Sequence, residues 1–372
     1  MSRHARLGYL AILLLAACSP GSDDPIYIGL AGAFDDEVGH PMTLGAQLAV
    51  EEINAAGGVN GRPIALLERN DYGNPDSAVM VAIDLYASDA VAVVGHLYSG
   101  TTLAASPVYN SGATPIVAIS PSSSAPDVSE MGPYTFRVCP SDEQHGETLA
   151  AWIRERLGLR YGSVFYLNDG YGRGVRQRFT AEFVRRGGVL GAVAPYLGGT
   201  PEVDALMDRL AQDTAAQFIV VAGNLSEAEE ILRQARARGV TLPLLGADGL
   251  EGIEGSGPIA EGVYETLAYL PQLDRPGNRQ FVASYTEHFP DEPPPNQPAA
   301  ASYDAIHLLK RVMLEHGSER EAIREGLEAV TVEEPFEGVT GQIAFDGNGD
   351  VPTREVYVAV VRNGALRLAG GQ

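Results

Sequence analysis

The chain has 372 residues, of which 45% are hydrophobic and 20% charged, and its 48 acidic and 26 basic side chains give a formal net charge of −22. This composition is globular and excludes a disordered chain, while the length suggests two domains of about 150 residues each. The negative charge repels phosphate backbones and no run of Lys and Arg interrupts it, so nucleic acid is not an expected partner.

The first residues have the pattern of an export signal. Arg3 and Arg6 precede an apolar run over 7–15, which is shorter than the ~20 apolar residues of a membrane span. Small residues then lead to Cys18, and a small polar stretch follows it. We therefore expect a signal peptide at 1–17 and a tether at 18–25. No later stretch approaches a membrane span, so we expect the rest of the chain to be soluble.

The ending Leu15-Ala16-Ala17-Cys18 resembles the lipobox of bacterial lipoproteins, in which the cysteine becomes the lipid-modified first residue. The resemblance implies that Cys18 is acylated and anchors the protein to a membrane. An ordinary secretory signal with a chance cysteine is the alternative. Acylation of Cys18 would leave Cys139 without a partner, so we predict no disulfide and expect Cys139 to be a buried small hydrophobe.

From residue 26 onward, short apolar strands alternate with helices. Strands are predicted at 26–30, 64–67, 91–95 and 115–119. A first helix has Leu44, Leu48 and Ile53 on one face and ends at 57–58, where two glycines follow each other. In the next helical segment, the predicted apolar face consists of Val79, Ile83 and Tyr86.

The pattern starts again after residue 160, with strands at 163–167, 218–221 and 242–246 and helices over 172–187, 203–213 and 226–238. Such strands are typical of a parallel sheet covered on both faces, which predicts an α/β fold of two successive doubly wound units. The proline-rich stretch 290–298 predicts a surface loop. Helical spacing resumes at Tyr303, and a final strand over 355–361 is expected to end the fold.

Motifs for catalysis or metal binding are missing. The sequence has no phosphate loop, no His-Glu-x-x-His and no Cys-x-x-Cys, so we expect neither an enzyme nor a metal or cofactor. The stretch 346–350 imitates the start of a calcium loop, but Tyr357 replaces the required glutamate, and we predict a glycine-rich hairpin turn. The acidic run 35–37 is read as a solvated loop, with recognition of a cationic ligand group as the alternative.

Small hydroxyl residues follow two neighbouring strands, in the segments 96–102 and 120–124. Hydroxyls and free N–H groups at helix N-termini favour an anion, although simple helix capping would explain either segment alone. In the second unit, Tyr171 and Asp248 also follow strands. An acid that faces an anion site across a crevice suits a zwitterion, with its carboxylate toward the hydroxyls and its ammonium toward Asp248.

Five segments carry a family resemblance: 93–99, 119–121, 136–138, 171–174 and 345–350. In this order they resemble the type I periplasmic binding proteins of branched-chain amino acid ABC transporters, over about 26–365. The resemblance implies two Rossmann-like lobes joined by a three-crossover hinge, with lobe 1 at 26–142 plus 271–345 and lobe 2 at 143–270 plus 346–372.

The resemblance also implies roles for single residues. The hydroxyls of Ser99 and Ser124 would bind the ligand carboxylate or ammonium, Ser122 would contribute backbone groups, and Asp248 would hold the ammonium. Tyr171 would contribute from the second lobe. Tyr98 and Thr101 belong to the same hydroxyl-rich segment as Ser99. Val38 and Asn224 stand where the family often has aromatic residues, which indicates an altered side-chain pocket.

The resemblance implies a non-enzymatic, lipid-anchored receptor in the periplasm or at the cell surface. It would capture an amino acid or a related zwitterion and deliver it to ABC permease subunits. Two alternatives remain open. One is a two-lobed lipoprotein that regulates an envelope enzyme or sensor, and the other is a receptor for an amide, urea or aromatic acid.

Overall fold

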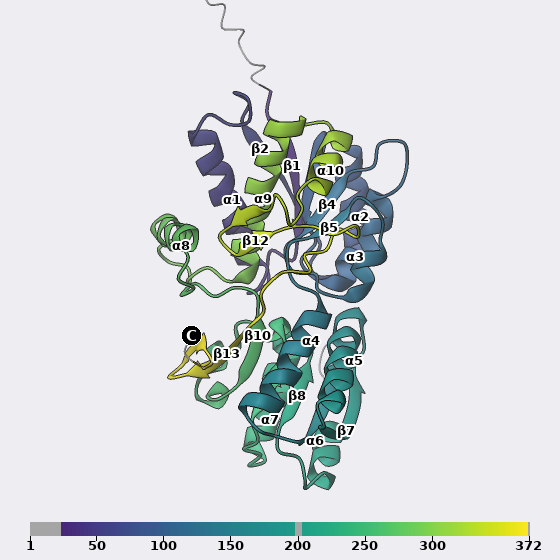
Figure 1. The fold of residues 1–372 in the computed structure, drawn as a ribbon, viewed down its shortest axis with the longest axis vertical. Helices are drawn as coiled ribbons and strands as arrows, with labels where there is room; N and C mark the ends of the chain where they lie inside the picture. The colour runs from purple at the N-terminus through teal and green to yellow at the C-terminus, as the bar shows by residue number, and fades with distance from the viewer. Residues whose placement is uncertain (1–23, 198–202, 371–372) are drawn as a thin grey trace, which may run out of the picture.

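The computed structural model describes residues 24–197 and 203–370, which form two α/β lobes stacked end to end (Figure 1). The first lobe is built on a five-stranded sheet of order β2-β1-β3-β4-β5, in which every pairing is parallel. Its strands are β1 (Ile26–Gly32), β2 (Ile64–Asn70), β3 (Ala90–Gly95), β4 (Val117–Ser120) and β5 (Thr135–Arg137).

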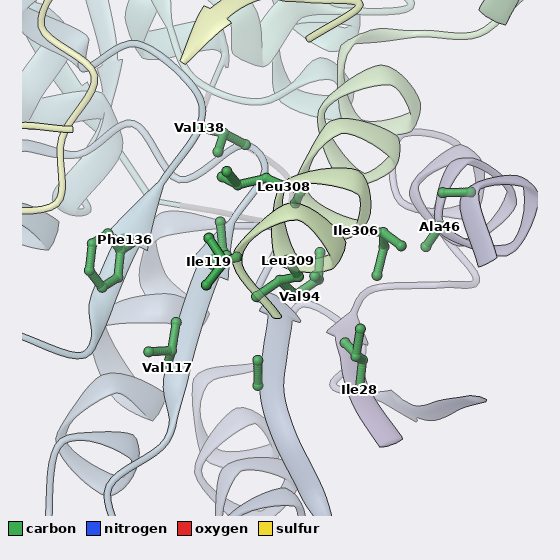
Figure 2. Close-up of a cluster of buried hydrophobic side chains, with 14 of the residues drawn as sticks. Ile28, Ala46, Val94, Val117, Ile119, Phe136, Val138, Ile306, Leu308 and Leu309 are labelled. Carbon is green, nitrogen blue, oxygen red and sulfur yellow. The ribbon is translucent and has the colours of Figure 1, made fainter. Parts of the chain in front are cut away.

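Helices cover both faces of this sheet, which explains why its strands β1, β3 and β4 are almost wholly apolar. One face packs against α1 (His40–Ala55), α9 (Gln297–His316) and α10 (Arg320–Glu328), and the other against α2 (Pro75–Ala87) and α3 (Ser99–Tyr109). Figure 2 shows Leu308 and Leu309 of α9 over the strand residues Val94 and Ile119. The helix α8 (Pro276–His288) packs beside α1 and α9.

The second lobe has a seven-stranded sheet of order β14-β13-β10-β9-β8-β6-β7. Its strands are β6 (Tyr161–Leu167), β7 (Val189–Tyr196), β8 (Ile219–Ala222), β9 (Leu244–Gly246), β10 (Tyr264–Leu267), β13 (Tyr357–Arg362) and β14 (Ala365–Leu368). Its helices are α4 (Asp142–Ala151), α5 (Gly170–Arg185), α6 (Val203–Gln212) and α7 (Leu225–Ala237), and a π-helical turn η2 (Trp152–Arg156) extends α4.

Short elements complete the fold. Three 3-10 segments occur at η1 (Pro126–Glu130), η3 (Asp248–Leu250) and η4 (Ile253–Ala260), and a separate hairpin joins β11 (Phe336–Gly338) to β12 (Gly341–Ile343). Within the described ranges, no helix is both long and apolar enough to cross a membrane.

The chain passes between the lobes three times: from β5 into α4, from β10 into α8, and from β12 into β13. The predicted α/β fold of two doubly wound lobes with a three-crossover hinge is therefore confirmed. The expectation of two successive units is wrong, because β13 and β14, near the end of the chain, complete the second sheet. β13 pairs antiparallel with β10, and β14 pairs antiparallel with β13. The residue boundaries given above for the lobes stay a prediction.

The buried face of α2 differs from the predicted one. Ala78, Ala82 and Leu85 are buried, while Ile83 is 47% exposed. The small alanines allow close packing against β1 and α3, so the larger residues one position away are left toward solvent. A period of 3.6 residues alone does not reveal this shift when apolar residues occur on both sides of the helix.

Three other expectations need correction. The predicted loop 290–298 ends earlier, because Gln297 and Pro298 are buried in the first turn of α9, where proline is tolerated. The strand predicted at 355–361 does not end the fold, since β14 follows it. The stretch 346–350 is a turn in which the Asp346 N–H donates to the Asp350 carbonyl and the Gly349 N–H donates to the Asp346 carbonyl. It is not a hairpin turn, because β12 and β13 belong to different sheets.

One strand that the sequence pattern does not predict is β7, at the edge of the second sheet. Three of its eight residues are exposed and three are half-buried, so the apolar run that marks a central strand is missing. Cys139 is buried as predicted, at 2% exposure, and burial raises the pKa of its thiol to about 12.

Candidate functional site

The first part of the site is the N-terminus of α3. The strand β3 ends at Gly95, which has a φ of +138° and where a Cβ atom would lie 2.2 Å from the backbone oxygen of Ala31. Only glycine fits this turn, which leads the chain into α3 at Ser99. The Ser99 hydroxyl accepts a hydrogen bond from the Ala125 N–H at 3.1 Å, so its own proton remains free for a ligand.

The second part is the serine-rich loop between β4 and η1. The Ser120 hydroxyl donates to the His96 carbonyl at 2.7 Å and accepts from the Ser123 N–H at 2.9 Å. From behind the loop, the Arg137 guanidinium donates to the carbonyl of Ser124 at 3.0 Å. Arg137 is only 2% exposed. These bonds hold the loop with Ser122 and Ser124 at the wall of the cleft.

The second lobe presents Tyr171 from the start of α5. The Asp169 carboxylate caps this helix by accepting the Gly172 N–H at 2.8 Å. A Cβ atom on Gly172 would lie 2.2 Å from the backbone oxygen of Leu167, so glycine is required for the helix to begin this close to β6. The cap and the glycine together place the Tyr171 ring at the cleft.

Asp248 follows β9 and lies beside Tyr171. The Tyr171 hydroxyl donates to Asp248 Oδ1 at 3.1 Å. On the other side, His145 Nε2 lies 3.5 Å from Asp248 Oδ2, and His145 Nδ1 lies 3.0 Å from the Thr266 hydroxyl. Burial lowers the pKa of His145, so its ring is neutral at pH 7 and does not compensate the charge of an ionised Asp248.

These groups surround a small cavity of about 60 Å³ between the lobes. Eight of the nine residues expected to bind a ligand line it, namely Val38, Tyr98, Ser99, Ser122, Ser124, Tyr171, Asn224 and Asp248. We call this space the head-group cavity. Hydroxyl groups lie on one side of it and Asp248 on the other, which is the arrangement predicted for a zwitterion.

Thr101 is the candidate that does not line the head-group cavity. Its hydroxyl donates to the Tyr98 carbonyl at 2.8 Å, a local bond within the first turn of α3. Tyr98 does line the cavity, and its hydroxyl donates to Asp36 Oδ2 at 2.5 Å. Asp36, from the acidic run 35–37, is therefore bonded to a site residue.

Six further residues line the head-group cavity although they were not expected: Leu97, Gly100, Asp169, Leu225, Gly249 and Glu251. Glu251 is the most consequential of them. Its carboxyl accepts the N–H of Gln297, in the first turn of α9, at 2.7 Å, and burial raises its pKa to about 8. Only its spacing, three residues after Asp248 in a turn-rich segment, could have indicated it from sequence.

The two-lobed fold with a polar cavity between the lobes is that of a receptor for small solutes. The family model described as "Periplasmic binding protein" matches residues 26–365, so the chain belongs to that family.

Among curated relatives, an amino acid binding protein of Pseudomonas aeruginosa is 32% identical over 274 residues, which cover 71% of this chain and 72% of the relative. The leucine-specific-binding protein of Salmonella typhimurium is 27% identical and covered to 86% in both chains.

Among solved structures, the branched-chain amino acid transporter substrate binding protein LivJ from Streptococcus pneumoniae, in complex with isoleucine, has a TM-score of 0.83 at 26% identity. The match covers 93% of this chain and 99% of that one. A solute binding protein of R. palustris in complex with benzoate also has a TM-score of 0.83, at 21% identity and with 93% and 96% coverage, which is a likeness of fold alone.

Proposed function

We propose that the protein is a non-enzymatic receptor of an ABC importer that captures an amino acid or a related zwitterion between its two lobes. One observation carries the proposal: Ser99, Ser122 and Ser124 face Asp248 and Tyr171 across the head-group cavity. The hydroxyls and the free N–H groups of the first turn of α3 would receive the carboxylate, and Asp248 would receive the ammonium.

The electrostatics of the cavity support a ligand with both charges. Asp248 is 8% exposed, and His145 beside it is neutral, so the closed cavity favours a cation at this point. A neutral solute would leave the Asp248 carboxylate desolvated without compensation, which costs free energy. The ligand would bind the closed form more tightly than the open form, and this difference in affinity would stabilise closure of the lobes.

A ligand screen tests this proposal. The purified protein is titrated by calorimetry, after a thermal-shift screen, with the twenty amino acids and with small carboxylates, amides and aromatic acids. We expect at least one α-amino acid to raise the unfolding temperature, and its desamino and decarboxylated analogues to bind much more weakly. Equal binding of an amino acid and its desamino analogue would contradict the zwitterion site.

We further propose that the protein is extracytoplasmic and anchored through a lipid on Cys18, which lies outside the described residues. The proposal rests on the lipobox-like ending and on relatives that are periplasmic receptors. Intact-mass analysis of membrane-extracted protein should show an acylated N-terminal cysteine after loss of residues 1–17. A mature N-terminus without lipid at Cys18 would refute the anchor, and copurification with permease subunits would support the transport role.

A further inference from the structure

A second and larger cavity adjoins the head-group cavity. Its volume is about 1090 Å³, and Val38, Leu225 and Glu251 line both spaces. No aromatic side chain stands at these shared positions. A ligand whose head group lay between the serines and Asp248 would therefore meet Val38, Leu225 and Glu251 where its side chain enters the second cavity.

The wall of the second cavity has an apolar part and an acidic part. Leu267, Tyr269 and Leu270, all at most 2% exposed, provide an apolar surface near the hinge. Glu251 and Glu254 lie on the same lobe as Asp248 and also line this space. An apolar surface that ends at carboxylates suits a methylene chain that ends in a cation.

The carboxylates on this wall have no cationic partner. In the described part of the chain, no Lys or Arg nitrogen lies within 4.0 Å of the carboxylates of Asp248, Glu251 or Glu254. One carboxylate oxygen of Glu254, Oε2, is buried and has no hydrogen-bond partner. The basic residues that line the second cavity elsewhere are Arg367 and His40, and His40 Nε2 lies 3.5 Å from Glu292 Oε1.

A fourth carboxyl group, that of Glu265, lies close enough to interact electrostatically with these three. Glu265 is fully buried, and neither of its side-chain oxygens has a partner in the structure. Burial raises the pKa of Glu265 well above its usual range, and the charges of Glu254, Glu251 and Asp248 raise it further. Burial of Glu251 and Glu265 without a counter-charge favours their protonated forms, and a cation that approached the wall would stabilise their ionised forms.

We infer that the ligand carries a second positive charge and is a basic α-amino acid, whose side chain passes between Val38 and Leu225 and places its cation against Glu251 and Glu254. The inference rests on the proposed function, because it assumes that the α-ammonium is held at Asp248. It assigns the second cavity as the side-chain compartment of the same site.

The test compares L-arginine, L-citrulline and L-leucine by calorimetry on the unmodified protein. Citrulline matches arginine in length but has a neutral urea group, so the affinity ratio of the two isolates the side-chain charge. We expect arginine to bind at least tenfold more tightly than citrulline. Equal affinities, or tighter binding of citrulline, would overturn the inference.

The variant Glu254→Gln tests whether Glu254 is the group that distinguishes arginine from citrulline. Because Glu254 Oε2 has no partner in the structure, the amide should fold normally and lower the arginine-to-citrulline ratio at least fivefold while leaving citrulline binding unchanged. The control is Glu143→Gln, an exposed acid in α4 of the same lobe that lines neither cavity, and we expect it to keep the ratio. An unchanged ratio in Glu254→Gln, or an equal loss in both variants, would refute the assigned position.

Failure of this inference can be told apart from failure of the proposed function. If leucine binds and arginine does not, the amino-acid receptor stands and the basic ligand is refuted. If no amino acid binds, the proposed function falls and the inference falls with it.

Discussion

Tyr171 and Asp248 form one unit: the phenol donates to Asp248 Oδ1 at 3.1 Å and accepts the Gly249 N–H at 2.8 Å. The tyrosine therefore connects the start of α5 to the segment that follows β9. Its hydrogen bond fixes one carboxylate oxygen, and the second oxygen faces His145 at 3.5 Å. The carboxylate is thus oriented before a ligand arrives, which lowers the entropic cost of binding.

The first prediction concerns Asp248. The substitution Asp248→Ala should weaken binding of an amino acid by about 1–3 kcal/mol, because a charge-assisted hydrogen bond to the ammonium is lost. Calorimetry with the amino acid and with its desamino analogue measures this, and only the amino acid should be affected. Unchanged affinity for the amino acid would place the ammonium elsewhere.

The second prediction concerns the carboxylate side. Ser99→Ala removes a hydroxyl that lines the head-group cavity, and we expect a loss of about 1 kcal/mol in ligand affinity. The matched control is Ser106→Ala in the same helix, where the buried hydroxyl donates to the Thr102 carbonyl at 2.8 Å and does not line the cavity. Both variants should lose some stability, but only Ser99→Ala should lose affinity. Equal affinities of the two variants would argue that Ser99 is merely structural.

The third prediction tests the glycine at the start of α5. In Gly172→Ala, the new methyl group would meet the Leu167 carbonyl oxygen at 2.2 Å. We expect the free energy of unfolding to fall by about 1–3 kcal/mol or more, as in other overpacked sites. Gly255→Ala, where no atom lies within 4 Å of the added Cβ, should be close to neutral. Urea denaturation of both variants checks this, and a fully stable Gly172→Ala would show that α5 can begin elsewhere.

The fourth prediction is a pH dependence of stability from Glu251. Burial raises its pKa from an ordinary 4.5 to about 8, so between these values the folded protein binds a proton that the unfolded chain has lost. The free energy of unfolding should therefore fall as the pH rises toward 8.

The range between pH 6.5 and about 8 isolates this effect from the histidines. Burial lowers the pKa of His145 and His307 from 6.5, so both are mainly neutral in either state above that value. Asp142 and Glu265, whose pKa values burial also raises, contribute with the same sign as Glu251. Denaturant unfolding over this range should show a steeper decline in the unmodified protein than in Glu251→Gln. Parallel curves would contradict the raised pKa.

Much of the fold follows from the sequence because its signals are local. Apolar strands such as 91–95 and the glycines at helix ends depend on neighbouring residues, and the order of strands and helices predicts a doubly wound fold. The same locality explains why Ser99 and Asp248 could be proposed. Each follows a predicted strand, and parallel strands bring their carboxyl ends to one edge of a sheet.

Other features depend on contacts between distant parts of the chain. The sequence pattern cannot show that β13 and β14 return to the second sheet, because strand pairing at long range leaves no mark on local periodicity. The buried face of α2 was set by which side fits closely against β1 and α3, not by which residues are larger. The sequence does not predict β7, because an edge strand can remain partly exposed and then lacks a continuous apolar run.

The sequence by itself determined the class of fold, the acidic charge and most of the residues around the head-group cavity. Only the tertiary structure decided that Thr101 faces its own helix and that Glu251 joins Asp248 at the cavity. The packing of the two lobes, which three crossovers join, decides which side of a helix or turn faces the cleft. The same packing creates the second cavity and leaves the carboxyl groups of Glu251 and Glu254 without a Lys or Arg partner. Such burial without a counter-charge arises only when distant segments of the chain pack together.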